Sequence, residues 1–305
     1  MKKLGILVPL VTPCTRTGEV DEAGLRAVCG DMLGAGCHSI FVAGSTGRGP
    51  WFARQDRERI CRTVADEVGK DVLLFAGCMA PGLTDMLENA RALADAGAQI
   101  AVVTAPGYFN YSQQEVEAIF SRFADRSPLP VMIYDIPVFT GMKLDLGVTA
   151  RLATHGNIVG FKDSSSDIER FEQMARLLNG ERAFYLLQGK EHSLADALRV
   201  GASGFVVSLV QIDPRPFAAL YQAAEAGDHA RAGAIQRKIT ELLGIVEGCF
   251  ARRPETSTLF HLLNYALQAR GACANIMLEH EGECPGWLAD EARRALGILE
   301  EARDL

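Results

Sequence analysis

Short apolar runs alternate with segments of helical periodicity from the start of the sequence to about residue 227. Apolar runs of strand length, separated by amphipathic helices, are the signature of βα units and a parallel sheet. Most runs are apolar throughout, as in Ile40–Ala43 and Ile100–Val103, which is typical of strands covered on both faces. We predict eight strands, near residues 6–12, 39–43, 72–76, 100–104, 131–134, 158–162, 184–188 and 204–208.

Helix boundary signals fall between these runs. Ser112 and Ser166 each precede a Glu by three residues, which predicts two capping boxes. Asp213 before Pro214 predicts a helix start. Four glycines predict helix ends: Gly36, Gly97, Gly201 and Gly227. Because no nucleotide-binding fingerprint follows the first strand, these units favour a closed (β/α)8 TIM barrel over an open sheet.

Strand signals vanish after residue 227, and helical segments remain near 228–250, 255–270 and 286–303. The sequence therefore predicts an α/β fold in two parts. Residues 1–227 form the (β/α)8 barrel that carries the active site. Residues 228–305 form a C-terminal helical domain, which we interpret as an appendage.

Composition narrows the class of ligand. Hydrophobic residues make up 48%, and 31 Lys and Arg stand against 38 Asp and Glu, a net charge of −7. Such a chain offers no basic surface to nucleic acid or to an anionic membrane, and no apolar run has membrane-spanning length. The eight cysteines include no C-x-x-C pair and follow no secretory signal. We expect reduced thiols, no metal site and a cytoplasmic protein that binds a small molecule.

In a barrel of this kind the chemistry lies at the carboxyl ends of the strands. Lys162 closes the apolar run 158–161, where burial would lower the amine pKa and produce a nucleophile toward a ketone. The alternative is a lysine that reaches solvent or pairs with Asp163 or Asp167. Tyr134 ends the preceding strand, about 4.8 Å away in a parallel sheet. It is either a proton shuttle beside Lys162 or an aromatic packing residue.

A loop with two glycines and two hydroxyls, Gly44-Ser-Thr-Gly47, follows the second strand. Its backbone N–H groups and hydroxyls are suited to bind a carboxylate or a phosphate. The same residues also suit a plain helix N-cap. The loop lacks the lysine of a P-loop, which excludes a nucleoside triphosphate site.

Three motifs together resemble the dihydrodipicolinate synthase and N-acetylneuraminate lyase family. They are Gly44-Ser-Thr-Gly47, Tyr134-Asp-Ile-Pro137 with Thr140-Gly141, and Gly160-Phe-Lys162-Asp-Ser-Ser. The resemblance runs from about Ile6 to the C-terminal helices. It implies a (β/α)8 barrel with a C-terminal helical domain that forms a Schiff base between a lysine and a 2-keto acid.

The resemblance also implies roles for individual residues. Lys162 would form the Schiff base, and Tyr134 would shuttle protons. Ser45 and Thr46, with Gly47 in the same loop, would hold the carboxylate of the keto acid. Further substrate contacts would fall on Ser164, Gly189, Glu191 and Ser208. The family needs no metal or organic cofactor and usually forms homotetramers, so we expect a homo-oligomer, either a tetramer or a dimer.

Three positions depart from the family pattern. Arg48 stands where Glu commonly follows the Gly-Ser-Thr-Gly loop, and we expect its cation to change the charge of the mouth. Phe109 replaces the second tyrosine of a Tyr-Tyr pair, which puts a proton relay across a subunit interface in doubt. Phe139 replaces the arginine by which dihydrodipicolinate synthases anchor the carboxylate of aspartate semialdehyde.

These observations predict a Schiff-base lyase for pyruvate-yielding 2-keto acids, namely a 2-keto-3-deoxy sugar acid aldolase or dehydratase. The alternatives are an N-acetylneuraminate lyase-like enzyme, which Ser45 and Ser208 favour, or a dihydrodipicolinate synthase-like enzyme. A catalytically silent barrel that binds a keto acid is a further alternative, which Arg48 and Phe109 leave open.

Overall fold

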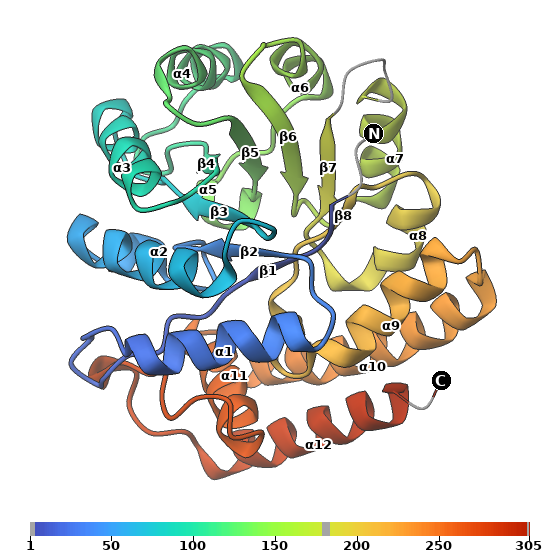
Figure 1. Cartoon of the computed structure of the whole chain (residues 1–305). Helices are drawn as coiled ribbons and strands as arrows, with labels where there is room; N and C mark the ends of the chain where they lie inside the picture. The colour runs from blue at the N-terminus through green and yellow to red at the C-terminus, as the bar shows by residue number, and fades with distance from the viewer. Residues whose placement is uncertain (1–3, 179–183, 304) are drawn as a thin grey trace.

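The computed structural model describes residues 4–178, 184–303 and 305. Eight parallel strands close into a barrel in chain order, with the last strand paired to the first (Figure 1). The fold is the predicted (β/α)8 TIM barrel with C-terminal helices. The strands are β1 (Gly5–Pro9), β2 (Ser39–Val42), β3 (Leu73–Gly77), β4 (Ile100–Thr104), β5 (Val131–Asp135), β6 (Ile158–Asp163), β7 (Tyr185–Gln188) and β8 (Gly204–Phe205).

Helices surround the barrel and continue beyond it. They are α1 (Glu22–Gly34), α2 (Arg54–Val68), α3 (Leu83–Asp95), α4 (Gln113–Arg126), α5 (Pro137–Thr140), α6 (Leu146–Ala153), α7 (Ile168–Leu178), α8 (Leu194–Arg199), α9 (Pro214–Glu225), α10 (His229–Arg252), α11 (Ser257–Ala269) and α12 (Gly286–Arg303). Short 3-10 turns are η1 (Gly49–Trp51), η2 (Glu191–Ser193), η3 (Ser208–Gln211) and η4 (Glu279–Glu281).

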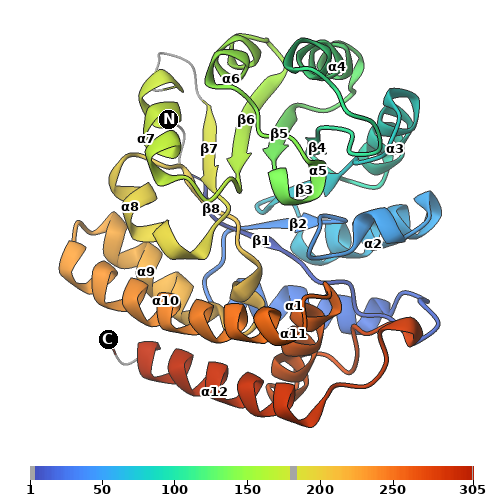
Figure 2. The ribbon, with the colours of Figure 1, turned by 180° about the vertical axis from the view of Figure 1, so that it is seen from behind.

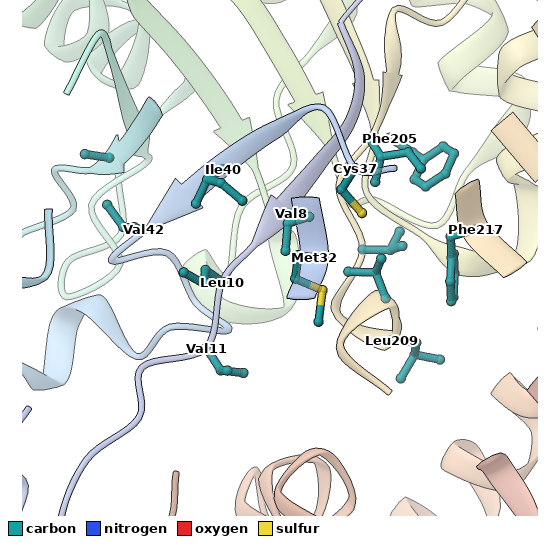
Figure 3. Close-up of a cluster of buried hydrophobic side chains, with 14 of the residues drawn as sticks. Val8, Leu10, Val11, Met32, Cys37, Ile40, Val42, Phe205, Leu209 and Phe217 are labelled. Carbon is teal, nitrogen blue, oxygen red and sulfur yellow. The ribbon is translucent and has the colours of Figure 1, made fainter. Parts of the chain in front are cut away.

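The side chains of each strand alternate between the barrel interior and the layer under the helices, as the period of two requires. In β5, Met132 and Tyr134 belong to the interior cluster, whereas Val131 and Ile133 pack in the outer layer. Figure 3 shows the outer layer beside β1 and β2, where strand and helix side chains meet. This alternation explains the continuously apolar strands and places every second strand residue inside the barrel.

Most predicted helix boundaries are confirmed. Ser112 forms the predicted capping box with Glu115 at the start of α4, and the Asp213 side chain caps α9 ahead of Pro214. All four predicted stop glycines adopt a positive φ. The capping box at Ser166 is wrong. Asp167 caps α7 instead, because its carboxylate accepts the Arg170 N–H at 2.9 Å.

Two predicted strands end earlier than expected. β1 stops at Pro9 rather than at residue 12. β8 pairs only over Gly204 and Phe205, and Ser208 begins the turn η3 instead of ending a strand. The Val206 N–H still donates to the Gln188 carbonyl at 2.8 Å. The chain therefore leaves the sheet immediately afterwards and carries Ser208 over the end of the barrel.

The C-terminal helices pack against one side of the barrel. α10 contacts α9, α8 and α12, and α11 contacts the turn η3 (Figure 2). α10 also reaches η2, where the Gln236 amide donates to the Glu191 carbonyl at 2.8 Å. The part of the chain that the structure describes has no helix that is both long and apolar enough to cross a membrane.

Candidate active site

Lys162 lies inside the barrel near the carboxyl end of β6, directly opposite Tyr134 of β5 in the strand register. Its side chain is buried, and its Nζ lies 3.8 Å from the centroid of the Tyr134 ring. The ring of Phe41 lies on another side, at 5.6 Å. Asp163 pairs with Arg170 and Asp167 pairs with Lys143. The two alternative ion-pair partners of Lys162 are thus engaged elsewhere.

The surroundings of Lys162 make it a nucleophile near neutral pH. Burial among aromatic side chains lowers the pKa of Lys162 from 10.5 to about 7, against the opposing charge of Glu191. An ordinary lysine with a pKa of about 10.4 is almost wholly protonated at pH 7. A large share of Lys162 is therefore a neutral amine that can attack a carbonyl carbon.

Tyr134 is buried beside this amine. Burial raises the pKa of Tyr134 to about 12, and hydrogen bonding to Ser164 and Ser45 offsets only part of that rise. The phenol therefore stays protonated over the physiological range. A phenol placed between two hydroxyls and an amine can accept or donate a proton through a short relay.

The loop after β2 holds its hydroxyls in place through tight backbone packing. Ser45 and Thr46 line a cavity at the barrel mouth, and the Thr46 hydroxyl lies 2.8 Å from that of Ser208. Gly47 lies behind the loop, where its carbonyl accepts the Thr12 hydroxyl at 2.7 Å. A Cβ on Gly47 would come within 2.6 Å of the Leu10 carbonyl. Gly47 thus shapes the loop, while Ser45 and Thr46 face the cavity.

The segments that follow β6, β7 and β8 contribute the remaining predicted residues. Ser164, at the end of β6, donates to the Gly189 carbonyl at 3.2 Å. A Cβ on Gly189 would collide with the Ser164 hydroxyl and approach Lys162. Glu191, in η2, accepts the Leu209 N–H at 3.3 Å, and burial raises the pKa of its carboxyl. The structure gathers all four, including Ser208, in the wall of one cavity together with Tyr134.

A cavity of about 310 Å³ lies beside Lys162 and is lined by its neighbours Tyr134, Gly189 and Glu191. Its walls come from the barrel loops and also from the C-terminal helices. These helices contribute Leu243, Val246, Glu247 and Phe250 of α10, with Thr256, Leu259 and Phe260. The interpretation of residues 228–305 as a mere appendage is therefore wrong. This contact could not be predicted from the sequence, because an apolar helix face does not identify its partner.

A buried ion-pair cluster beneath the site was missing from the sequence interpretation. Arg170 of α7 donates to Asp163 and to Asp135, each at 2.8 Å, and to the Leu144 carbonyl at 2.7 Å. Asp135 and Asp163 directly follow Tyr134 and Lys162 and face each other across β5 and β6. Burial raises the pKa of both carboxyls, and the Arg170 charge opposes the rise. The sequence did contain a signal for this cluster, because an aspartate directly follows each of the two candidate catalytic residues.

The three departures from the family pattern lie in different surroundings. Arg48 pairs with Glu281 at 3.0 Å, so the expected change in the charge of the mouth is compensated by a residue far along the chain. Phe139 lines the cavity with its side chain 57% exposed. Phe109 is exposed and packs edge-on against Tyr108 and Tyr111.

Within residues 4–178, 184–303 and 305, no three His, Cys, Asp or Glu side chains gather into a metal site. The eight cysteines are free, and seven of them are buried. Burial raises the pKa of these thiols, to about 12 for Cys61 and Cys78, which suppresses the reactive thiolate. The ionisable side chains that line the cavity are Tyr134, Lys190, Glu191 and Glu247.

The sequence matches known proteins over most of its length. The model of the dihydrodipicolinate synthetase family matches residues 2–279. The chain is 32% identical over 237 residues to 4-hydroxy-tetrahydrodipicolinate synthase 1 of Streptomyces coelicolor, which covers 78% of this chain and 76% of the relative.

Solved structures share the fold. The chain superimposes with a TM-score of 0.88 and 24% identity on dihydrodipicolinate synthase from Acinetobacter baumannii in complex with pyruvate, covering 97% of this chain and 99% of that one. CdNal from Clostridium difficile, solved in complex with mannosamine, gives a TM-score of 0.85 at 19% identity, with the same coverage of 97% and 99%. At these identities the structural likeness supports the fold alone.

Proposed function

Because the chain belongs to the dihydrodipicolinate synthetase family, and so is a lyase of the class I aldolase type, we propose that it acts on a 2-keto-3-deoxy sugar acid. It does so either as an aldolase that releases pyruvate or as a dehydratase. The observation that carries this proposal is the buried Lys162 amine, with a pKa lowered to about 7 and its Nζ 3.8 Å from the Tyr134 ring centroid.

The first step is formation of an imine. The neutral Nζ of Lys162 attacks the C2 ketone, and proton transfers through Tyr134 let the ketone oxygen leave as water. The product is an iminium that draws electrons from C3. Ser45 and Thr46 hold the C1 carboxylate through their hydroxyls and the loop N–H groups, as a short helix-entry loop is suited to do.

The second step depends on which bond breaks. In the aldolase, Tyr134 has given its proton to the departing water and is transiently a phenolate, so it can take the proton of the C4 hydroxyl. The C3–C4 bond then breaks, and its electron pair neutralises the iminium as an enamine. The aldehyde leaves, C3 is reprotonated, and water hydrolyses the imine to release pyruvate. In the dehydratase, the same imine promotes loss of a proton from C3 and departure of a hydroxyl as water.

The walls of the mouth favour a polyhydroxylated partner over aspartate semialdehyde. Ser45, Ser164 and Ser208 present hydroxyls to the cavity, and the Glu191 carboxyl accompanies them. Phe139, by contrast, offers neither a charge nor a hydrogen bond at the position where a synthase anchors a second carboxylate. These features support a sugar acid substrate, with Ser164, Gly189, Glu191 and Ser208 around its chain.

Assembly, location and domain division complete the proposal. The exposed rings of Tyr108 and Phe109 form an aromatic patch beside the mouth, and such a patch supports a homo-oligomer, a tetramer or a dimer. The free cysteines support a cytoplasmic location. We assign residues 1–227 to the barrel domain and residues 228–305 to a helical domain whose side chains complete the site.

Covalent trapping tests the chemistry. Incubation with pyruvate and borohydride should attach one reduced pyruvate-derived group to the peptide that contains Lys162, as read by mass spectrometry. Lys162→Met should give no adduct, whereas Lys190→Met should still give one at Lys162. A panel of five- and six-carbon 2-keto-3-deoxy acids, assayed for pyruvate release and for loss of water, then identifies the reaction.

Each outcome separates the alternatives. An adduct at Lys162 together with turnover of a panel member supports the enzyme. An adduct without turnover of any member, and without condensation with aspartate semialdehyde, indicates a silent keto-acid-binding barrel. No adduct, or an adduct on another lysine, contradicts the assignment of Lys162.

A further inference from the structure

A second cavity adjoins the one beside Lys162. It has a volume of about 650 Å³ and shares Ser45, Ile136, Phe139, Thr256 and Phe260 with the first. Its other walls come from the loops after β2 to β5 and from the C-terminal segments around α11 and η4. A substrate whose keto end reaches Lys162 therefore has room for its distal end in this second cavity.

Arg48 forms part of the wall of this second cavity. The residue adopts a left-handed backbone conformation, with φ 54°. Its side chain points away from Ser45 and Thr46 and toward the C-terminal segments. Its guanidinium carbon lies 3.8 Å from the centroid of the Phe260 ring, and its Nη1 lies 3.0 Å from Glu281. Only 10% of the Arg48 side chain is exposed.

The Nη2 of Arg48 is buried and has no hydrogen-bond partner among the described residues. An unsatisfied donor on a buried charged group is costly, so such a group favours any state that supplies an acceptor. Glu281 meets Nη1 through Oε2, which lies 3.0 Å away and also accepts the Leu278 N–H at 2.8 Å, and it gives Nη2 no hydrogen bond. A ligand in the adjoining cavity can supply the missing acceptor.

The other charges on this wall are already paired. Arg253 pairs with Glu255 at 3.5 Å and donates to the Ser257 hydroxyl at 3.2 Å. His280 stacks on Trp51, with ring centroids 4.6 Å apart. Arg48 is thus the cation of this wall for which a buried donor without a partner is found among the described residues. A guanidinium binds a carboxylate more strongly than it binds a neutral hydroxyl.

We propose that the second cavity binds a distal carboxylate of the substrate through Arg48, so that the preferred substrate is a 2-keto-3-deoxy dicarboxylic acid. Because Nη2 is covered in the free protein, binding tilts the guanidinium away from Phe260 and toward the cavity, while Nη1 keeps its contact with Glu281. This inference rests on the proposed function, since it assumes that the keto end is held at Lys162.

The test compares two substrates that differ only at the far end. One is a six-carbon 2-keto-3-deoxy diacid, and the other is the monoacid with a terminal CH2OH in place of the second carboxylate. The quantity measured is the ratio of kcat/KM for the diacid to kcat/KM for the monoacid. The wild type should prefer the diacid. Arg48→Met should reduce the ratio about 10- to 150-fold, the effect of one charge-assisted hydrogen bond.

Removal of Arg48 leaves Glu281 without its partner, so a second pair of variants controls for damage to the fold. In Glu281→Gln the amide oxygen can still accept the Leu278 N–H, and the guanidinium loses its competing carboxylate. Its ratio should exceed that of the wild type. Adding Arg48→Met to Glu281→Gln should remove the gain. Arg253→Met, on the same wall, should change the ratio less than threefold.

The failure of this inference is distinct from a failure of the proposed function. If the pyruvate adduct forms at Lys162 and the wild type does not prefer the diacid, the distal site is wrong and the Schiff-base chemistry stands. A ratio that falls in Arg253→Met and not in Arg48→Met also overturns the assignment. If no adduct forms in the wild type, the proposed function itself is wrong.

Discussion

Two largely buried arginines, Arg170 and Arg48, lie on two sides of the barrel mouth, and they differ in how fully they are paired. On the side of β5 and β6, Arg170 donates to two carboxylates and one carbonyl, and all of these groups are buried. On the side of β2 and the C-terminal segments, Arg48 has one carboxylate partner, and its buried Nη2 has no hydrogen-bond partner in the described part of the chain.

This difference separates two tasks of an active site. A buried cluster in which the charged groups all have partners has one low-energy arrangement. Arg170 therefore holds the strand ends that carry Tyr134 and Lys162 in a fixed relation. A buried donor without a partner, such as Nη2 of Arg48, gains a hydrogen bond only when a ligand binds. We therefore interpret the β5–β6 side as the part that sets the chemistry and the Arg48 side as the part that selects the substrate.

The largest expected effect comes from removing the phenol on the β5–β6 side. In Tyr134→Phe the ring still fills the space beside Lys162, so the protein should remain folded and still form the pyruvate adduct. General acid–base assistance is typically worth about 10²- to 10⁴-fold. Turnover of the best substrate should fall within that range, as measured by steady-state pyruvate release.

The matched control for this variant is Tyr111→Phe, which alters a partly buried tyrosine that packs against Phe109. Its turnover should stay close to that of the wild type. If Tyr134→Phe turns over at the original rate, Tyr134 is a packing residue. Proton transfer would then belong to another group, such as Tyr108, a substrate carboxylate or ordered water.

The Arg170 cluster should produce the next largest effect, this time on stability. Arg170→Met leaves Asp135 and Asp163 buried without their cation, and breaking such a cluster typically costs about 3 to 5 kcal/mol. The free energy of unfolding, measured by urea denaturation, should fall by that amount. Where the variant folds, kcat should fall more than KM rises, because the catalytic pair loses its fixed spacing.

Arg176 on the same helix supplies the control. Its side chain is 77% exposed and pairs with Glu172 at 3.1 Å. Exposed pairs of this kind contribute at most about 1 kcal/mol, so Arg176→Met should be nearly neutral. Equal losses in the two variants would contradict a special role for the buried cluster, and Arg170→Lys should restore part of the stability because it keeps the charge.

The contrast between the two sides also explains what the sequence predicted well. The strand positions follow from short apolar runs that alternate with helical segments, and Lys162 closes one of these runs. The barrel and the Tyr134–Lys162 pair could therefore be predicted from the sequence. The partner of Arg48 could not. Glu281 lies more than two hundred residues from Arg48, and nothing in a local pattern joins them. Even the nearby cap of α7 was misassigned, since Ser166 and Asp167 are both good capping residues.

A gain of function on the substrate-selecting side is the third prediction. Phe139 provides no charge for aspartate semialdehyde, so the wild type should condense it with pyruvate poorly. Phe139→Arg adds a cation at the cavity wall and should raise kcat/KM for this condensation about 10- to 150-fold. Phe109→Arg places the same charge at an exposed position that does not line either cavity. This variant should give no such gain. Efficient condensation by the wild type would contradict the proposed role of Phe139.

The smallest effect concerns the pH dependence of imine formation, and it tests the buried side directly. Only the neutral amine attacks a ketone, so the rate of adduct formation should rise with pH and level off above the pKa of Lys162. With that pKa lowered by burial to about 7, the rate should increase about tenfold between pH 6 and pH 9, nearly all of it below pH 8. An amine with an ordinary pKa of about 10.4 would instead gain tenfold with every pH unit across this range. The pKa of Tyr134 is raised to about 12, so its phenol should add no inflection below pH 10. Timed mixing with pyruvate and a borohydride quench gives the profile. A continued rise beyond pH 9 would mean that Lys162 is solvated in the working enzyme and that the barrel interior does not activate it.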